Sequence, residues 1–179
     1  AQAALSLVNP SSMLVGNLDL VTVGGSGTGA LTYQIVSAGT AGCTLSGGRL
    51  TAATSGSCTV KALKAASTNY TAIESAVQTI TVNKLSQIVS FTSSIPMYPV
   101  PGGVYQVAAT SSSNLSVAFS ITTGSGTTCR FDNANPGMLQ FLTSGPCVIR
   151  ATQAGNAIYN ADFAQQTITI GSLNQSITW

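Results

Sequence analysis

The amino-acid sequence predicts an all-β protein built from antiparallel β-sandwiches. One observation is a regular alternation of apolar and polar residues, the pattern of a strand with one buried face. LTYQIV at residues 31–36 shows this alternation, and VAFSI at residues 117–121 shows it again. The whole pattern also occurs twice along the chain, and no segment carries a helical period of any length. The sequence therefore predicts two domains of the same β fold.

Each copy contains about seven short expected strands, separated by turns rich in Gly and Ser, such as GGSGTG at residues 24–29. A sheet with one apolar face cannot bury that face alone, so two sheets must pack together. Seven short strands with regular turns are typical of an antiparallel sandwich. The expected strands are 4–8, 18–23, 31–36, 43–45, 49–52, 57–64 and 76–82 in the first copy, and 87–92, 104–109, 117–122, 128–131, 138–142, 146–153 and 164–170 in the second.

The duplication is clearest around two cysteines. SGSCTVKA at residues 55–62 returns as SGPCVIRA at residues 144–151, and QTITV at residues 78–82 returns as QTITI at residues 166–170. We interpret these segments as the same strands in two copies of one domain. The second copy carries a short insertion around residues 131–137.

A third copy begins where the second ends. LSQIVSF at residues 85–91 follows the first QTITV, and LNQSITW at residues 173–179 follows QTITI. We therefore expect the natural protein to continue beyond this chain. The expected parts are a first repeat at residues 1–84, a second repeat at residues 85–172, and the first strand of a truncated third repeat at residues 173–179.

The chain has four cysteines and no histidine. Spacing alone cannot choose among their possible pairings, but each repeat contains two of them. Pairing within repeats is the economical choice, which joins Cys43 to Cys58 and Cys129 to Cys147. A metal site is the rival interpretation, and it lacks both a CxxC spacing and a histidine ligand. Disulfides predict an oxidising environment outside the cytoplasm.

Charge is sparse in this sequence. Charged residues make up 6% of the chain, against roughly 25% in ordinary soluble domains, and hydrophobic residues make up 44%. The net charge is +2 without a basic cluster, which argues against a nucleic-acid partner. No apolar run approaches the roughly 20 residues of a membrane span, and residues 1–8 lack a signal-peptide pattern. We expect an extracellular protein, at the cell surface or secreted.

The second repeat carries the most specific motif, ATQAGNAIYNAD at residues 151–162, followed by QTITI. With the cysteine strand before it, this order resembles the tandem immunoglobulin-like repeats of large bacterial cell-surface, adhesin-like proteins. The first repeat departs from the motif but keeps Asn69 and Tyr70. The resemblance implies an all-β chain of two tandem immunoglobulin-like antiparallel β-sandwich domains, each with one intradomain disulfide. It also implies a stalk or spacer role, although a few such repeats bind ligands.

Two side-chain roles follow from the repeat. Tyr70 and Tyr159 occupy equivalent positions, and we expect each to bury its ring and to hydrogen-bond its hydroxyl to nearby backbone. Lys61 and Arg150 alternate with core residues, so we expect both to face water. These are structural roles, and none of them implies a ligand.

Catalytic chemistry is not predicted. Without histidine, a Ser–His or Cys–His arrangement cannot form, so we expect no catalytic residue, no metal and no cofactor. The acids are few and scattered along the chain. Asp132, Asn133 and Asn135 form a weak candidate for calcium, and loop structure is the simpler interpretation. GGSGTG is followed by a strand, so it is a turn rather than a phosphate-binding loop.

The most distinctive loop is SIPMYPVPGG at residues 94–103. Its centre, Pro96, Met97, Tyr98 and Pro99, is a candidate contact surface, because rigid aromatic side chains make good anchors. The alternative is that Met97 and Tyr98 pack over the end of the sandwich or against the neighbouring domain. The first repeat also has a Pro and a Met there, which favours packing.

Three functions remain open. The first is a structural spacer in a long extracellular repeat protein, whose partners are neighbouring immunoglobulin-like repeats; the short connector at residues 82–87 predicts a semi-rigid rod. The second is a protomer that self-associates into filaments by strand addition. The third is a module that binds a host or surface glycan or protein through the 94–103 loop. In the second function, the filament, the segment exchanged between molecules would contain Leu173, Gln175, Ile177 and Trp179.

Overall fold

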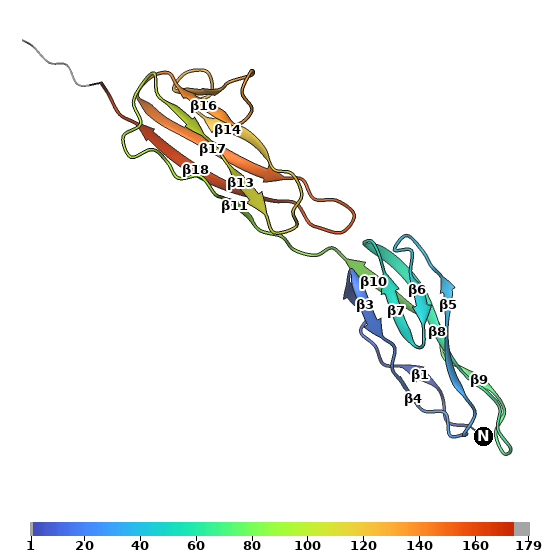
Figure 1. Cartoon of the computed structure of the whole chain (residues 1–179). Helices are drawn as coiled ribbons and strands as arrows, with labels where there is room; N and C mark the ends of the chain where they lie inside the picture. The colour runs from blue at the N-terminus through green and yellow to red at the C-terminus, as the bar shows by residue number, and fades with distance from the viewer. Residues whose placement is uncertain (1, 174–179) are drawn as a thin grey trace, which may run out of the picture. The chain divides into compact units, whose positions relative to one another are not determined.

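The computed structural model describes residues 2–173, in which every regular element is a β-strand (Figure 1). The chain divides into two compact units. Unit 1 comprises Ala1–Leu85 and unit 2 comprises Ser86–Trp179. Each unit has its own hydrophobic core, and the two cores share no residue.

Unit 1 is a sandwich whose larger sheet has the order β2-β10-β8-β5, with β9 pairing β8, and whose second sheet has the order β3-β7-β6. β10 pairs antiparallel with β8 and parallel with β2, whereas β1 pairs with β4. An early strand that pairs in parallel with the last one is a feature of immunoglobulin-like sandwiches. The strands are β1 (Ser6–Leu7), β2 (Ser12–Leu14), β3 (Gly16–Asp19), β4 (Thr22–Val23), β5 (Leu31–Ser37), β6 (Thr44–Ser46), β7 (Arg49–Ala52), β8 (Gly56–Lys64), β9 (Ile73–Glu74) and β10 (Gln78–Asn83).

Unit 2 repeats this plan with sheets of order β14-β17-β18 and β12-β16-β15, and with the pair β11-β13. The position of β2 is taken by the proline-containing segment at residues 94–101, which joins the end of the last strand through the Gly171 N–H and the Pro99 C=O, 2.8 Å apart. Proline has no N–H, so this segment cannot form a regular ladder. The strands are β11 (Val89–Phe91), β12 (Val104–Gln106), β13 (Ala109–Ser111), β14 (Ala118–Thr123), β15 (Cys129–Phe131), β16 (Met138–Phe141), β17 (Gly145–Gln153) and β18 (Asp162–Ile170).

The core of each unit follows from the two-residue period of its strands. On β10, Ile80 is fully buried while Thr79 and Thr81 are exposed, and β18 repeats this order. The central strand β8 turns Cys58, Val60 and Ala62 inward, as the alternation predicts. The side chains with no exposed surface include Leu50, Val60 and Ile80 in unit 1, and Leu139, Ile149 and Ile168 in unit 2.

Both predicted disulfides are present. Cys43, just before β6, is bonded to Cys58 on β8, with the two Cα atoms 6.2 Å apart. Cys129 on β15 is bonded to Cys147 on β17, with a Cα separation of 6.0 Å. In each unit the bond therefore ties one sheet of the sandwich to the other. All four cysteines are at most 3% exposed.

Two of the expected strands are broken in the structure. The segment expected as one strand at 18–23 is split into β3 and β4, which belong to different sheets, and 104–109 is split into β12 and β13. A side chain from the first part of each repeat stabilises the break. The side chain of Asn9 accepts the Val21 N–H, and Ser93 Oγ accepts the Ala108 N–H.

The hydrogen bonds expected for the repeated tyrosines are absent. Tyr70 and Tyr159 are partly buried, but neither hydroxyl hydrogen-bonds another described residue. The buried tyrosine with a bonded hydroxyl is Tyr105, which is 5% exposed. Its hydroxyl lies 2.7 Å from Ser93 Oγ and donates to Gln166 Oε1 at 2.9 Å. The sequence pattern did not single out this residue.

The glutamine of LSQIVSF is buried in a polar network. Gln87 is 7% exposed and donates from Nε2 to Gln153 Oε1 at 2.6 Å. Its Oε1 accepts the hydroxyl of Ser113, and Ser111 joins the same network through that hydroxyl. These bonds anchor the first segment of unit 2 to its later strands.

Replacing Gln87 with leucine is expected to lower the free energy of unfolding of unit 2 by about 1–3 kcal/mol, because buried partners then lose their hydrogen bonds. The measurement is urea denaturation followed by amide NMR signals of unit 2. Gln165→Leu is the matched control, since Gln165 is exposed and makes no side-chain hydrogen bond with the described residues. Equal effects of the two substitutions would contradict the anchoring role.

Candidate functional site

The candidate loop of unit 2 presents two large side chains to solvent. Met97 and Tyr98 are each 82% exposed, between the partly buried Pro96 and Pro99. The interpretation that they pack over the end of their own sandwich is therefore wrong. The turn at Gly102 and Gly103 returns the chain to β12, where the Gly103 N–H bonds the Val100 C=O. Met97 and Tyr98 therefore form an exposed apolar and aromatic surface on this loop.

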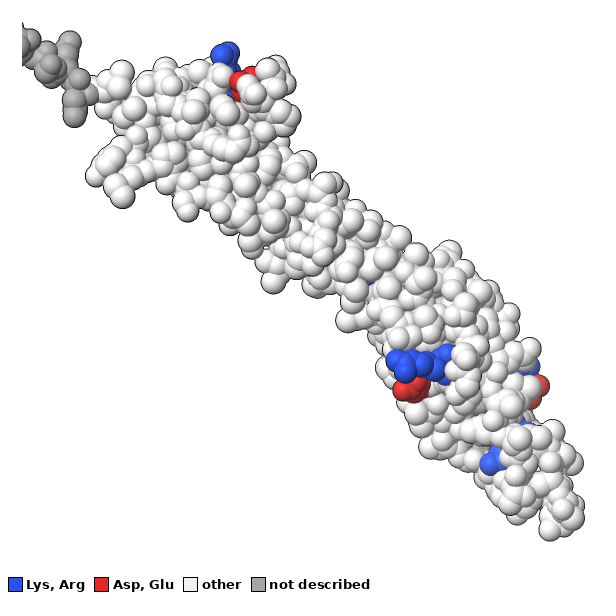
Figure 2. All heavy atoms as spheres, in the orientation of Figure 1, with Lys and Arg blue, Asp and Glu red and all other residues white. Residues whose placement is uncertain are grey.

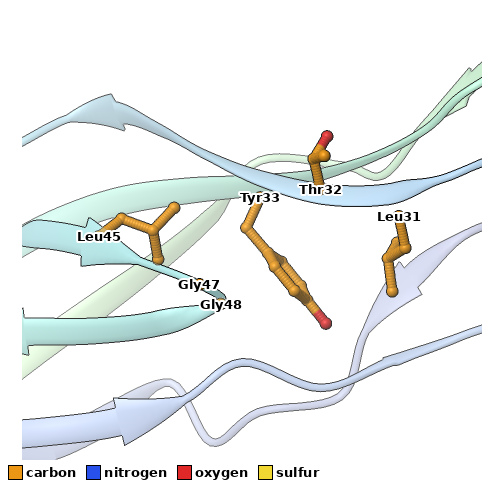
Figure 3. A pocket seen from close by; sticks show the side chains of 6 residues that line it. All are labelled: Leu31, Thr32, Tyr33, Leu45, Gly47 and Gly48. Carbon is orange, nitrogen blue, oxygen red and sulfur yellow. The ribbon is translucent and has the colours of Figure 1, made fainter.

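A second feature is a hollow of about 300 Å³ on unit 1, shown in Figure 3. Tyr33 and Leu31 project from the same side of β5, and Thr32 projects from the other side. Leu45 of β6 lies nearby. The hollow is lined by Leu31, Thr32, Tyr33, Leu45, Gly47 and Gly48.

The floor of this hollow depends on a tight turn. Gly47 and Gly48 connect β6 to β7 and have φ angles of 56° and 88°. Two consecutive positive φ angles are typical of a two-residue hairpin turn and favour glycine at both positions. A Cβ atom at Gly48 would lie 3.2 Å from Tyr33 Cε2, so glycine also makes room for the ring. The sequence pattern did not single out this hollow, although the Gly-Gly pair is its visible signal.

Charged side chains are few on the face shown in Figure 2. Lys61 Nζ lies 2.7 Å from Glu74 Oε2, and the Lys61 side chain is only 21% exposed. Arg150 Cζ lies 3.8 Å from the centre of the Phe163 ring, and its Nε is buried. Both side chains point away from the core, as the alternation predicts, but each is only partly exposed. Both aliphatic stems lie on the sheet, while one head is paired and the other is stacked on an aromatic ring.

The Asp132 loop is organised by its own hydrogen bonds. Asp132 Oδ2 accepts from Asn135 Nδ2 at 2.9 Å, and Oδ1 accepts the Ala134 N–H at 2.9 Å. Both carboxylate oxygens therefore have hydrogen-bond donors within the loop itself. Within residues 2–173, no three His, Cys, Asp or Glu side chains gather closely enough to hold a metal ion.

These bonds hold the pKa of Asp132 below its ordinary value, with the Asn135 side chain as the main cause and the Ala134 amide next. The Asn135→Ala variant is expected to raise the pKa of Asp132 toward that value, measured by NMR titration of its carboxyl carbon. Because the folded pKa is the lower one, ionised Asp132 favours folding above the unfolded pKa. This contribution is lost as pH falls through the folded pKa. Asn133→Ala should leave the titration unchanged, and an unchanged titration in Asn135→Ala would refute the assignment.

The proposed strand-exchange segment lies mostly outside the described residues. Leu173 is 66% exposed, whereas Gln175, Ile177 and Trp179 belong to the part that the structure does not describe. The described residues contain no helix with the length and apolarity that a membrane span needs.

No protein-family model matches the sequence. No curated protein matches it either. Among solved structures, the chain is similar to a crystal structure of Drosophila N-cadherin EC1-4, with 13% identity and a TM-score of 0.36 over 94% of this chain and 51% of that one. It is also similar to Drosophila N-cadherin EC1-3, with 14% identity and a TM-score of 0.32 over 95% of this chain and 68% of that one.

A third similar structure is a C-terminal 282-residue fragment of intimin in complex with the intimin-binding domain of the translocated intimin receptor. It has 12% identity and a TM-score of 0.34, over 95% of this chain and 64% of that fragment. The chain thus spans between 51% and 68% of the lengths of these structures. The immunoglobulin-like assignment depends on the strand order and pairing of each unit.

Proposed function

We propose that this chain is a spacer segment of a long extracellular repeat protein of the adhesin-like kind, whose partners are neighbouring repeats. The observation that carries the proposal is that each unit is complete by itself. Each has its own buried core and its own disulfide between sheets. Because such a repeat folds around its own core, further copies can be added to an array without changes to the existing repeats.

The disulfides and the low charge support an extracellular setting. Both bonds are buried, and disulfides persist in oxidising compartments. The surface is covered largely by hydroxyl and amide side chains, because only 6% of the residues are charged.

The spacer proposal is tested by light scattering and small-angle X-ray scattering of the purified chain over a range of concentrations. We expect a monomer whose mass and dimensions do not change with concentration. Concentration-dependent growth into fibres would overturn it in favour of filament assembly.

Filament assembly is the second candidate, and one observation favours it. Residues 173–179 resemble residues 85–91, which include β11, and β11 pairs antiparallel with β13 in unit 2. A spare copy of this strand could take the place of β11 in another molecule. Fibres that form at high concentration and disappear on deletion of residues 173–179 would support this function.

Binding of a protein or glycan by the 94–103 loop is the third candidate, favoured by the exposure of Met97 and Tyr98. The test is glycan-array and surface-protein binding of the chain with Tyr98→Ala as the variant. Val104→Ala is the control, because Val104 is exposed outside this loop. If the Tyr98→Ala variant bound as well as the Val104→Ala control, binding through the 94–103 loop would be contradicted.

A further inference from the structure

We propose that the hollow beside Tyr33 on unit 1 is a binding site for a single neutral sugar ring. This inference goes beyond the spacer function, because a spacer needs no ligand. It is also separate from the 94–103 loop, which belongs to unit 2.

The size and lining of the hollow define what it can accept. Its volume of about 300 Å³ is at the small end of ligand pockets, so one ring and its substituents fit, but not a long ligand. Leu31 and Leu45 supply apolar surface, while the Tyr33 hydroxyl and the peptide groups of the Gly-Gly turn supply polar surface. A pyranose ring likewise has apolar and polar surface, because its faces carry C–H groups and its rim carries hydroxyl groups.

Tyr33 has the properties of a ring platform. Its ring is partly buried and packs against the core of unit 1, so its orientation is fixed. Its hydroxyl makes no hydrogen bond with any residue from 2 to 173, and neither do the backbone N–H groups of Gly47 and Gly48, whereas the Gly48 C=O accepts the Leu20 N–H at 2.9 Å. The electron-rich face of an aromatic ring attracts the slightly positive C–H groups of a sugar. The hydroxyl and the two amides are then available to the rim of the ligand.

Unit 2 carries different side chains at the corresponding positions. Phe119 occupies the place of Tyr33, and Phe131 the place of Leu45. The Phe119 ring lies 6.2 Å from Phe131 and 6.4 Å from Phe91 between centroids, so three phenyl rings pack together there. Unit 1 has the smaller Leu45 instead of a phenyl ring and carries the tyrosine hydroxyl. The two copies of one framework therefore differ in the side chains that surround this aromatic ring.

The electrostatics of the hollow favour a neutral ligand. No charged side chain lines it. The nearest charges along the chain follow the turn, where Arg49 Nε lies 3.9 Å from Asp19 Oδ1 on the neighbouring strand. These two charges oppose one another and are largely exposed. Lys64 lies opposite Leu31 in the β5–β8 register and does not line the hollow.

The direct test is a two-dimensional amide NMR titration of the full chain with methyl glycosides of glucose, galactose, mannose and N-acetylglucosamine, up to tens of millimolar. We expect at least one of them to shift signals from residues 31–48 with saturation, while signals from residues 117–131 stay in place. Glucuronic acid is the charged comparison and should bind at least several-fold more weakly.

Three variants test the geometry. Leu45→Phe copies the phenyl ring of unit 2 into the hollow and should abolish the saturable shifts. Tyr33→Phe keeps the ring and removes the hydroxyl, and it should weaken binding about 5-fold or more. Gln34→Ala is the control, because Gln34 is exposed on the opposite face of β5 and should bind like the unchanged chain.

The fold of each variant is checked by its amide spectrum, and unit 2 already accommodates phenylalanine at both corresponding positions. No saturable shift with any of the four glycosides would overturn the proposal. Equal shifts in the unchanged chain and in a folded Leu45→Phe variant would also overturn it. Neither result would affect the spacer function, which scattering tests independently.

Discussion

Replacing Leu139 with alanine is expected to lower the free energy of unfolding of unit 2 by about 2–5 kcal/mol and to leave unit 1 unchanged. Leu139 has no exposed surface and lies at the centre of the unit 2 core. Its loss leaves a cavity that the surrounding strands cannot fill. Leu50 occupies the same place in unit 1, so Leu50→Ala should lower the free energy of unfolding of unit 1 and leave unit 2 unchanged.

The measurement is urea denaturation followed by NMR, because amide signals report on each unit separately. Leu14→Ala and Val104→Ala are the matched controls, since these side chains are 56% exposed and should cost little. A single transition in which both units always unfold together, whichever leucine is replaced, would contradict independent units.

Loss of the disulfides has the second large expected effect. Replacing both Cys43 and Cys58 with alanine should lower the stability of unit 1 by about 3 kcal/mol, because the bond closes a loop of 15 residues. Replacing Cys129 and Cys147, which close a loop of 18 residues, should cost unit 2 about the same. Both effects act mainly on the unfolded chain, which gains conformational freedom.

These losses are measured by denaturation of the double variants beside the unchanged chain under oxidising conditions. Reductant provides the control, since it should destabilise the unchanged chain but not the chain lacking all four cysteines. If the double variants were as stable as the unchanged chain, the disulfides would have no stabilising role.

The class of fold and the pairing of the cysteines could be predicted from the sequence. Period-two alternation identifies Val60 and Ile149 as core residues, and the duplication assigns each cysteine its partner. The short strand β2 and the breaks at Leu20 and Val107 were not predictable in this way. Both breaks lie where the chain passes from one sheet to the other. The position of the first break depends on Asn9, whose side chain hydrogen-bonds the backbone of Asp19 and Val21, 10 and 12 residues later in the sequence.

The site was less accessible to sequence reasoning. The exposure of Tyr98 reverses the interpretation that favoured packing, because local prolines do not reveal whether a loop folds back on its sandwich. The hollow at Tyr33 arises from the volume of Leu45 on another strand and from a turn that needs glycine. Alternation shows that Tyr33 faces inward but does not show that its neighbours leave space beside it.

The central claim, two self-contained units that serve as a spacer, is tested most directly by pulling a single chain from its ends. We predict two separate unfolding events. Reduction should lengthen the released chain by about 45 Å in unit 1 and about 55 Å in unit 2, because the 15- and 18-residue loops are then free to extend. A single unfolding event, or released lengths that reduction does not change, would contradict this account.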